Sequence, residues 1–317
     1  MTGVLFFFVG VLTLAGIYAI FAQVLNLEAG WAGMWDLGLV GLVAVGGYTY
    51  IILTQTQNDE VVFAPGLPMW VGIIGAAAAG GLVAFVIGVP SLRVRGEFFL
   101  ITTLAFAEVI HQLTINLNSV TRGTVGFNQI ARPFESFVQG RGYRVLLLVL
   151  VWVIAGLVYL VMRRLANAPY GRLLRGFRDN DPVALSLGKH TNRHRIFTFV
   201  FAGVVYGGTA PLYVWFLRTA TPSVFSAEVT FVAWTALVIG GIASKSGPVI
   251  GAGILLLITE TVSLAQGSGD LAVVLSSARF IVLGLVLILV MRYRPEGLIS
   301  EQRSLGRASQ RMAKTTT

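Results

Sequence analysis

Residues 69–90 read MWVGIIGAAAAGGLVAFVIGVP, an apolar run of 22 residues without a single charged side chain. An α-helix needs about 20 mainly apolar residues to cross the hydrocarbon core of a membrane. A run of this length and composition therefore predicts a transmembrane helix.

Similar apolar runs recur along the whole chain. They lie at residues 4–25, 37–54, 98–116, 144–162, 196–217, 228–243, 248–265 and 272–291. Lipid cannot hydrogen-bond to the backbone, so each run must be helical or buried in protein. With 56% hydrophobic and 12% charged residues, the chain has about half the charge of soluble domains. We predict an all-α, polytopic integral membrane protein with about 8–10 transmembrane helices.

The domain plan that we expect is simple. A transmembrane domain covers residues 1–299, and a polar, basic tail over 300–317 is expected to be disordered. The N-terminus has no basic segment and no cleavage site after a short apolar core, so the first run should remain as a span. There is no cysteine, which excludes disulfides and thiolate metal sites.

The basic residues predict an orientation. If the spans alternate, 17 of the 23 basic residues fall on one side, in the loop 163–195, in the tail, and at Arg93, Arg95 and Lys245. This side is therefore expected to be cytoplasmic. The loop 117–143 does not fit, because it is expected outside yet carries Arg122, Arg132 and Arg141. Simple alternation puts the N-terminus outside, whereas a re-entrant segment near 26–36 would reverse it. Because the net charge of +9 sits in short loops, we expect no nucleic-acid partner.

No pattern for catalysis is present. Residues 240–247 read GGIASKSG, which lacks the glycine before the lysine of a phosphate-binding loop, so we expect no ATP hydrolysis. His111, His190 and His194 are not spaced like metal ligands, and neither H-E-x-x-H nor G-x-S-x-G occurs. We predict that the protein is not an enzyme and has no cofactor and no metal site.

The charged loop 163–195 contains a short predicted helix. Its centre, residues 171–188, reads GRLLRGFRDNDPVALSLG. Asp181 as N-cap, the proline after it and Gly188 as a stop predict a helix over about 182–187. Arg172, Arg175 and Phe177 suggest an amphipathic turn before it. Such a helix suits docking into a partner's groove, although any membrane protein of this class has positively charged inner loops.

Polar residues within the apolar runs are the usual indicators of a transport pathway. They are Gln23, Asn26, Glu28, Asp36, Glu108, His111, Gln112 and Glu260. The stretch 26–38 is either a broken helix that offers backbone groups to a solute or a short interfacial loop. Glu108 and His111 share a helix face and either form a pair or bond to a neighbouring helix. Glu260 can reach the membrane interface.

Five segments together resemble one known family. Residues 171–188 resemble the ATPase-coupling loop of the M-type permease subunit of branched-chain amino acid ABC importers, which reads about G-R-A-L-x-A-I-R-E-N-E-x-A-A-x-x-x-G. In the same order as in that family, similar stretches occur at 92–99 (LRVRGEFF), 103–110 (TLAFAEVI), 239–251 (IGGIASKSGPVIG) and 294–298 (RPEGL). The resemblance covers most of residues 15–300, and five collinear matches make it specific.

The resemblance implies a function and a set of partners. It implies ATP-driven import of a hydrophobic amino acid, Leu, Ile or Val, by alternating access in a bacterial-type inner membrane. The partners would be ABC ATPase subunits, a second related permease subunit and an extracytoplasmic solute-binding protein. The ATPase-coupling residues would be Gly171, Arg172, Arg175, Phe177, Arg178, Asp179, Asn180, Asp181, Ala184, Leu187 and Gly188.

The substrate pathway is a less direct expectation. It would include Asn26, Glu28, Asp36, Glu108, His111, Thr124 and Gly126. The chain departs from the family at 36–39, which reads DLGL in place of S-L-G-H, at 121–126, which reads TRGTVG in place of T-G-G-x-x-G, and at Ala243 and Lys245. These differences leave urea, short amides or another small solute open as the substrate. On the residues alone, a secondary transporter with a Glu108–His111 relay or a passive channel also remains open.

Overall fold

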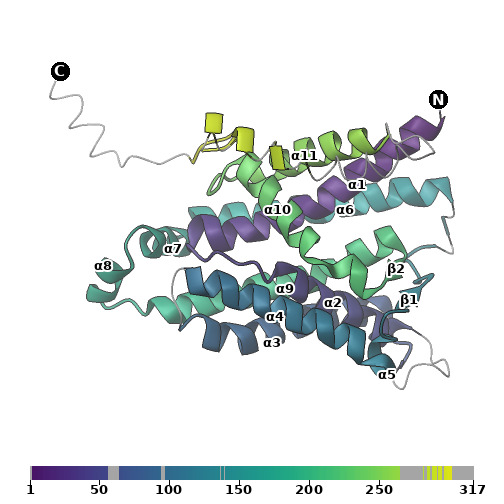
Figure 1. Cartoon of the computed structure of the whole chain (residues 1–317), viewed down its shortest axis with the longest axis horizontal. Coiled ribbons are helices and arrows are strands. Elements are labelled where there is room, and N and C mark those ends of the chain that lie inside the picture. The colour runs from purple at the N-terminus through teal and green to yellow at the C-terminus, as the bar shows by residue number, and fades with distance from the viewer. Residues whose placement is uncertain are drawn as a thin grey trace.

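The chain folds almost entirely into α-helices that run along the long axis of the molecule (Figure 1). This computed structural model describes residues 2–55, 64–93 and 97–264, apart from 136 and 139, and scattered positions between 281 and 301. The helices and strands are α1 (Thr2–Leu25), the π-helix η1 (Asn26–Trp31), α2 (Leu39–Thr54), α3 (Met69–Ser91), α4 (Glu97–Asn116), α5 (Asn118–Thr121), β1 (Phe127–Asn128), α6 (Arg141–Asn167), α7 (Pro169–Asp179), α8 (Asp181–Ser186), α9 (Thr191–Leu217), β2 (Thr219–Ala220), the 3-10 helix η2 (Pro222–Phe225), α10 (Ala227–Gly240) and α11 (Gly247–Leu264).

Six helical segments of the described part are long and apolar enough to cross a membrane. They are Val4–Trp31, Met69–Ser91, Phe98–Asn116, Arg141–Asn167, Thr191–Leu217 and Pro222–Gly240, and Leu39–Thr54 and Gly247–Thr261 are shorter apolar helices. The all-α, polytopic class is thereby confirmed. The expected span 272–291 and the tail from 302 fall mostly or wholly outside the described residues.

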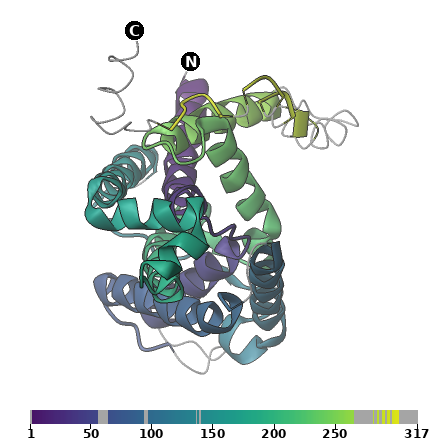
Figure 2. The same cartoon turned by 90° about the vertical axis from the view of Figure 1, so that its left-hand side faces the viewer.

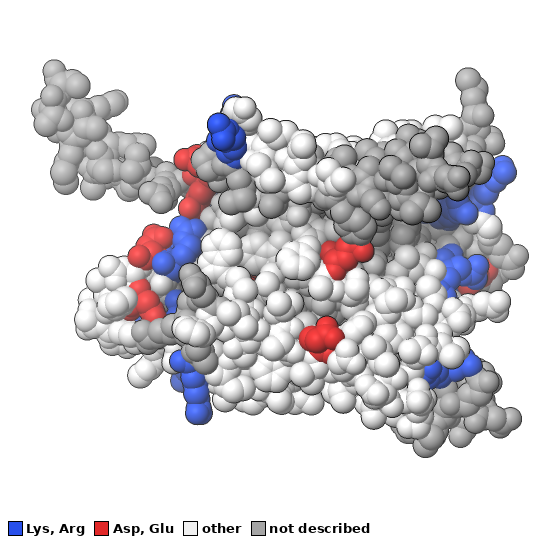
Figure 3. All heavy atoms as spheres, viewed as in Figure 1, with Lys and Arg blue, Asp and Glu red and all other residues white. Residues whose placement is uncertain are grey.

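The molecule has two distinct ends. Helices α7 and α8 lie at one end, which we call the α7–α8 end, and α5, β1 and β2 lie at the other, which we call the strand end (Figure 1). At the strand end, β1 pairs antiparallel with β2, with Phe127 opposite Ala220. Helix α1 begins at the strand end, as simple alternation of the spans predicts. Figure 3 shows charged side chains gathered at both ends and a mostly uncharged flank between them, which is the pattern expected of a membrane belt.

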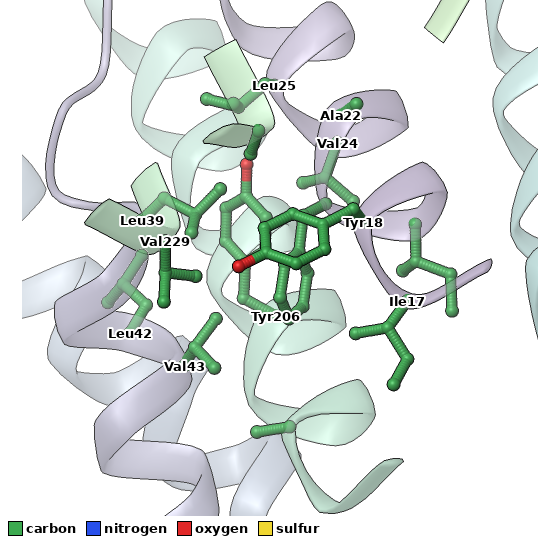
Figure 4. Packing of buried hydrophobic residues seen from close by; sticks show 14 of the residues in the cluster. Ile17, Tyr18, Ala22, Val24, Leu25, Leu39, Leu42, Val43, Tyr206 and Val229 are labelled. Atoms are coloured by element: carbon green, nitrogen blue, oxygen red, sulfur yellow. The ribbon is translucent and has the colours of Figure 1, made fainter. Parts of the chain in front are cut away.

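The core is built around α1, which packs against α6, α9, α10 and α11 (Figures 1 and 2). From Val11 of α1 to Trp31 of η1 the side chains are mostly buried, and Figure 4 shows the ring of Tyr206 from α9 among side chains of α1, α2 and α10. By contrast, α6 leaves Val149, Val153 and Leu157 more than half exposed. This apolar outer face is the side that lipid can cover.

Glycines set the spacing of α2, α3 and α9. A Cβ atom on Gly207 of α9 would meet the backbone carbonyl of Ala76 on α3, and one on Gly46 of α2 would meet the backbone of Gly207. The three helices therefore touch through their backbones, the close approach that small residues permit in membranes.

Candidate functional site

Side chains of helix α7 contact the start of α9. Leu174 and Phe177 are almost completely buried, and the Phe177 ring centroid lies 5.7 Å from that of His194. The Tyr170 hydroxyl donates to the carbonyl of His194 at 3.0 Å and contacts the Thr198 hydroxyl at 2.9 Å. Burial raises the pKa of Tyr170, and its bond with Thr198 acts in the opposite direction. The segment predicted as one amphipathic turn is thus a docked helix of 11 residues.

Helix α8 begins one residue earlier than the predicted 182–187. The N-cap is Asn180, not Asp181, because Asn180 has an extended backbone and its side-chain oxygen accepts from the Val183 N–H at 3.2 Å. Asp181 lies in the first turn and pairs with Arg195 of α9 at 3.3 Å. Gly188, with a φ of 74°, follows the helix as predicted.

The two faces of α8 differ. Ala184 is only 9% exposed, whereas Val183, Leu185 and Leu187 are 53%, 42% and 73% exposed. Exposed apolar side chains beside many charged residues are the kind of surface that a partner protein covers.

Two arginines of α7 bind backbone carbonyls. Arg175 donates to the Ala166 carbonyl at 2.7 Å, near the C-terminal end of α6. Arg178 donates to the carbonyl of Gly30 in η1 and pairs with Glu301 at 3.1 Å. Both side chains therefore connect α7 to other elements.

Three more of the expected coupling residues also have contacts within the chain. A Cβ at Gly171 would meet the carbonyls of Leu165 and Ala166. Arg172 donates to the Asn167 carbonyl, and Asp179 pairs with Arg178.

The first span is not interrupted at Asn26, as 26–38 had suggested, but continues to Trp31 as the π-helix η1, which we call the break, and only residues 32–38 are non-helical. Asn26 accepts from the Ala243 N–H at 2.7 Å and donates to the Ser244 carbonyl at 2.6 Å, and Trp31 donates to the Ala243 carbonyl at 3.2 Å. The break is thus fixed to the glycine-rich turn between α10 and α11. Both side-chain polar atoms of Asn26 are thus engaged in backbone bonds.

Two carboxyl groups are buried in and after the break. Glu28 and Asp36 are both 0% exposed. Glu28 accepts from the Tyr206 hydroxyl at 3.0 Å, and Asp36 accepts from the Gly38 N–H at 2.7 Å. One oxygen of each, and both side-chain polar atoms of Gln23, have no partner among the described residues. Buried polar groups of this kind mark functional positions in membrane proteins.

A second polar region lies on the surface of α4. Glu108 is exposed and accepts from Gln112 at 2.8 Å, so among the described residues its bond is to Gln112 and not to His111. Glu108 and His111 line a cleft of about 160 Å³ between α4 and the start of α10. Glu228, one residue beyond this lining, is also exposed. Figure 3 shows acidic side chains in the middle of the uncharged flank.

The expected pathway residues fall into three separate places. Asn26, Glu28 and Asp36 lie in the core, and Glu108 and His111 lie at the α4 cleft. Thr124 and Gly126 lie at the strand end, where Thr124 is exposed and Gly126 is buried against the backbone of β2. The core and the cleft are nevertheless close in the fold, because Thr103 of α4 accepts from the Leu37 N–H at 3.0 Å.

The sequence did not reveal some residues of these regions. Tyr206 is the hydroxyl partner of Glu28, and Trp234 of α10 stacks on Trp35 with ring centroids 5.2 Å apart. Trp234 also donates to the Asp36 carbonyl at 2.7 Å. A tyrosine and a tryptophan inside apolar runs were the only available signal, since each usually finds a hydrogen-bond partner when buried.

Comparisons with known proteins agree over most of the chain. A family model described as "Branched-chain amino acid transport system / permease component" matches residues 7–291. The high-affinity branched-chain amino acid transport system permease protein LivM of Escherichia coli is 29% identical over 319 residues, with 93% of this chain and 70% of that protein covered. The probable branched-chain amino acid transport permease protein LivM of Methanocaldococcus jannaschii is 26% identical over 325 residues, with 90% and 91% covered. Among solved structures, PsaBC from Streptococcus pneumoniae in complex with Fab aligns over 94% of both chains with a TM-score of 0.44 and 15% identity.

Proposed function

The chain belongs to the family of branched-chain amino acid transport system permease components, and from this premise we propose that it is the membrane-spanning subunit of an ATP-driven importer for branched-chain amino acids. The observation that carries this proposal is the family match over residues 7–291, which includes nearly all of the described helices. The relatives named as LivM permeases support the same solute class.

The α7–α8 end is the proposed docking site for the partner ATPases, and it faces the cytoplasm. The exposed side chains of Val183, Leu185 and Leu187 support this, since a helix docks by placing such apolar residues in a groove. The packing of α7 against α6, η1 and the start of α9 supports it too, because a coupling element must transmit force without deforming. The strand end then faces outward, toward an extracytoplasmic solute-binding protein.

We place the solute pathway beside α4 and the start of α10. A charged side chain in the centre of a bilayer costs about 2.5–3.5 kcal/mol even on insertion-based scales. Glu108 and Glu228, both exposed in or beside apolar helices, are therefore expected to face protein or water and not lipid. A second, related permease subunit that covers this surface would enclose the cleft between the two chains.

In this mechanism, movement of α7 reaches the pathway through the break in the first span. Arg178 joins α7 to η1, and η1 is joined through Asn26 to the α10–α11 turn. ATP-driven closure of the ATPases would shift α7 and α8, and the bonded chain of elements would pass this shift to α10, which borders the cleft.

A pull-down and a reconstitution test the proposal. The tagged chain, extracted from its native membrane in mild detergent, should bring down an ATPase with a phosphate-binding loop and a second permease. In liposomes, the complex should import leucine only with ATP on the α7–α8 side and the binding protein on the other. Uptake of leucine by the chain alone, or ATP-dependent uptake of urea or short amides in place of leucine, would contradict it.

A further inference from the structure

Two of the three arginines that do not fit the predicted orientation, Arg132 and Arg141, line one cavity at the strand end. A pocket of about 480 Å³ lies between α1, the start of α6, the end of α9 and the segment before α6. Arg132, Arg141, Arg144 and Arg218 line it, and among the described residues Glu135 is the one acidic member of the lining. Figure 3 shows basic side chains gathered at this end of the molecule.

The positive charge of this pocket is only partly neutralised. Glu135 pairs with Arg218. Arg132 donates to the Phe216 carbonyl at 3.3 Å and lies over the ring of Tyr143, 5.0 Å from its centroid. Burial, followed by the nearby charge of Arg218, lowers the pKa of Arg132. The arginines therefore repel one another in a partly buried space, an arrangement that an anion would stabilise.

The remaining donors of the pocket also suit an anion. Tyr143 belongs to the pocket lining and is 2% exposed. Its hydroxyl has no hydrogen-bond partner among the described residues. Buried hydroxyls normally have a hydrogen-bond partner. The pocket also contains the start of the 27-residue helix α6, whose N-cap is Gly140 and has no side-chain cap. The first N–H groups of a helix favour negative charge.

We propose that this pocket binds the phosphate of an anionic phospholipid in the leaflet at the strand end. The apolar surface next to the pocket favours a lipid over a free phosphate ion as the ligand. Val145 and Val149 are 44% and 57% exposed and form an apolar row about one and two turns after Arg141 on the outer side of α6. A phosphate held by the arginines would therefore place its acyl chains along this row. Four arginines against one glutamate favour a headgroup with no cationic group of its own.

Lipid binding to the purified protein tests this site. The full chain, extracted in mild detergent with the subunits that accompany it, is mixed with phosphatidylglycerol, with phosphatidylcholine of the same acyl chains, or with inorganic phosphate. Native mass spectrometry measures retained lipid and a melting curve measures stabilisation. We expect phosphatidylglycerol to be retained and to raise the Tm, and phosphatidylcholine and phosphate to have little effect.

Two variants change the pocket with little risk to the fold. Arg144→Gln removes an exposed charge and should weaken retention of phosphatidylglycerol about fivefold, since each arginine near anionic lipid contributes roughly 1 kcal/mol. Gly10→Leu fills the cavity, because a Cβ at Gly10 has no atom within 4 Å. Arg122→Gln, at the same end outside the lining, and Gly253→Leu, an equally open helix position, are the matched controls and should retain lipid normally.

Several outcomes would overturn the proposal. Equal retention of the two lipids, or full stabilisation by inorganic phosphate alone, would do so. The proposal is also wrong if Arg144→Gln and Gly10→Leu both have the wild-type Tm without lipid and both still bind phosphatidylglycerol normally. If Arg144→Gln weakened capture of an extracytoplasmic binding protein but left lipid binding intact, the arginines would serve protein docking and the lipid assignment would be wrong.

Discussion

Arg178 donates a hydrogen bond to the backbone carbonyl of Gly30, 148 residues earlier in the chain. The bond joins the helix that precedes α8 to the π-helical break of the first span. The same break is fixed to Ala243 through Asn26 and to α9 through the Glu28–Tyr206 bond. A displacement of α7 therefore has a direct route into the core of the bundle.

Replacing Arg178 with glutamine should uncouple ATP hydrolysis from transport. A hydrogen bond to a charged group contributes about 1.5–3 kcal/mol, so its loss should reduce coupled uptake by roughly tenfold or more. ATPase subunits should still bind, because the Arg178 side chain is only 21% exposed and does not belong to the exposed apolar face of α8. Leucine uptake and ATP hydrolysis are measured together in liposomes. Arg193→Gln, which changes an exposed arginine of α9, is the control and should behave as the wild type. If both variants import leucine equally well, the route through Gly30 is refuted.

Replacing Leu187 with aspartate should weaken ATPase binding. Leu187 is 73% exposed, and burial of a leucine side chain contributes about 1.5–3 kcal/mol. The expected loss of affinity is therefore about tenfold or more, measured by the amount of ATPase retained in a pull-down. Asn192→Asp adds the same charge to an exposed position nearby and should retain the ATPase.

Variants at Gly171 and Ala184 would not separate an effect on ATPase docking from an effect on folding. Both were expected in the coupling loop from the family resemblance, but a side chain at Gly171 would collide with the end of α6, and Ala184 is largely buried. A variant at either position changes packing within the chain. Wild-type retention of the ATPase by Leu187→Asp would therefore weigh directly against docking through α8.

The sequence predicted the elements that depend on local patterns. The spans follow from runs such as 69–90, and the bounds of α8 were predicted to within one residue because an N-cap side chain, a proline and Gly188 are local signals. The full length of α7 was not predicted, because its burial depends on contacts with other elements, such as that of Phe177 with His194 of α9.

The candidate site was predictable only as a set of residues. Glu28 and Asp36 were identified as polar groups at membrane depth, but no local signal reveals that Tyr206 reaches Glu28 across 178 positions. In the same way, Glu108 and His111 do share a face, but the cleft that they line is completed by Phe225 and Ser226 of a distant segment. Spacing along a helix shows which residues share a face and not what that face meets.

Replacing Tyr206 with phenylalanine should destabilise the protein. The variant leaves both oxygens of Glu28 without a partner among the described residues, since one already has none. An unsatisfied buried group costs about 1–3 kcal/mol, which a lower Tm of the detergent-solubilised protein should show. Tyr159→Phe removes a hydroxyl from a less buried position on α6 and should leave the Tm unchanged. A Tyr206→Phe variant with the wild-type Tm would mean that the bond to Glu28 does not stabilise the fold.

Replacing Gly207 with alanine should separate α3 from α9. The added Cβ would meet the carbonyl of Ala76 and the Cα of Gly80, and overpacking of this kind costs about 1–3 kcal/mol. Gly253→Ala makes the same change where the Cβ has no neighbour within 4 Å, so it should be neutral or slightly stabilising. Thermal unfolding of the two variants compares them directly. A stable Gly207→Ala variant would contradict the close backbone contact of these helices.

Replacing Glu108 with glutamine tests the proposed pathway. Glu108 is exposed, and among the described residues its hydrogen bond is to Gln112 of its own helix, so the Tm should hardly change. If the cleft carries solute between two permease subunits, loss of this charge should lower leucine uptake severalfold while assembly with the ATPases remains normal. The matched control is Glu260→Gln, the same chemical change in α11, away from the α4 cleft. Normal uptake by Glu108→Gln would remove Glu108 from the pathway, and an equal loss in both variants would show that the effect is not specific to the cleft.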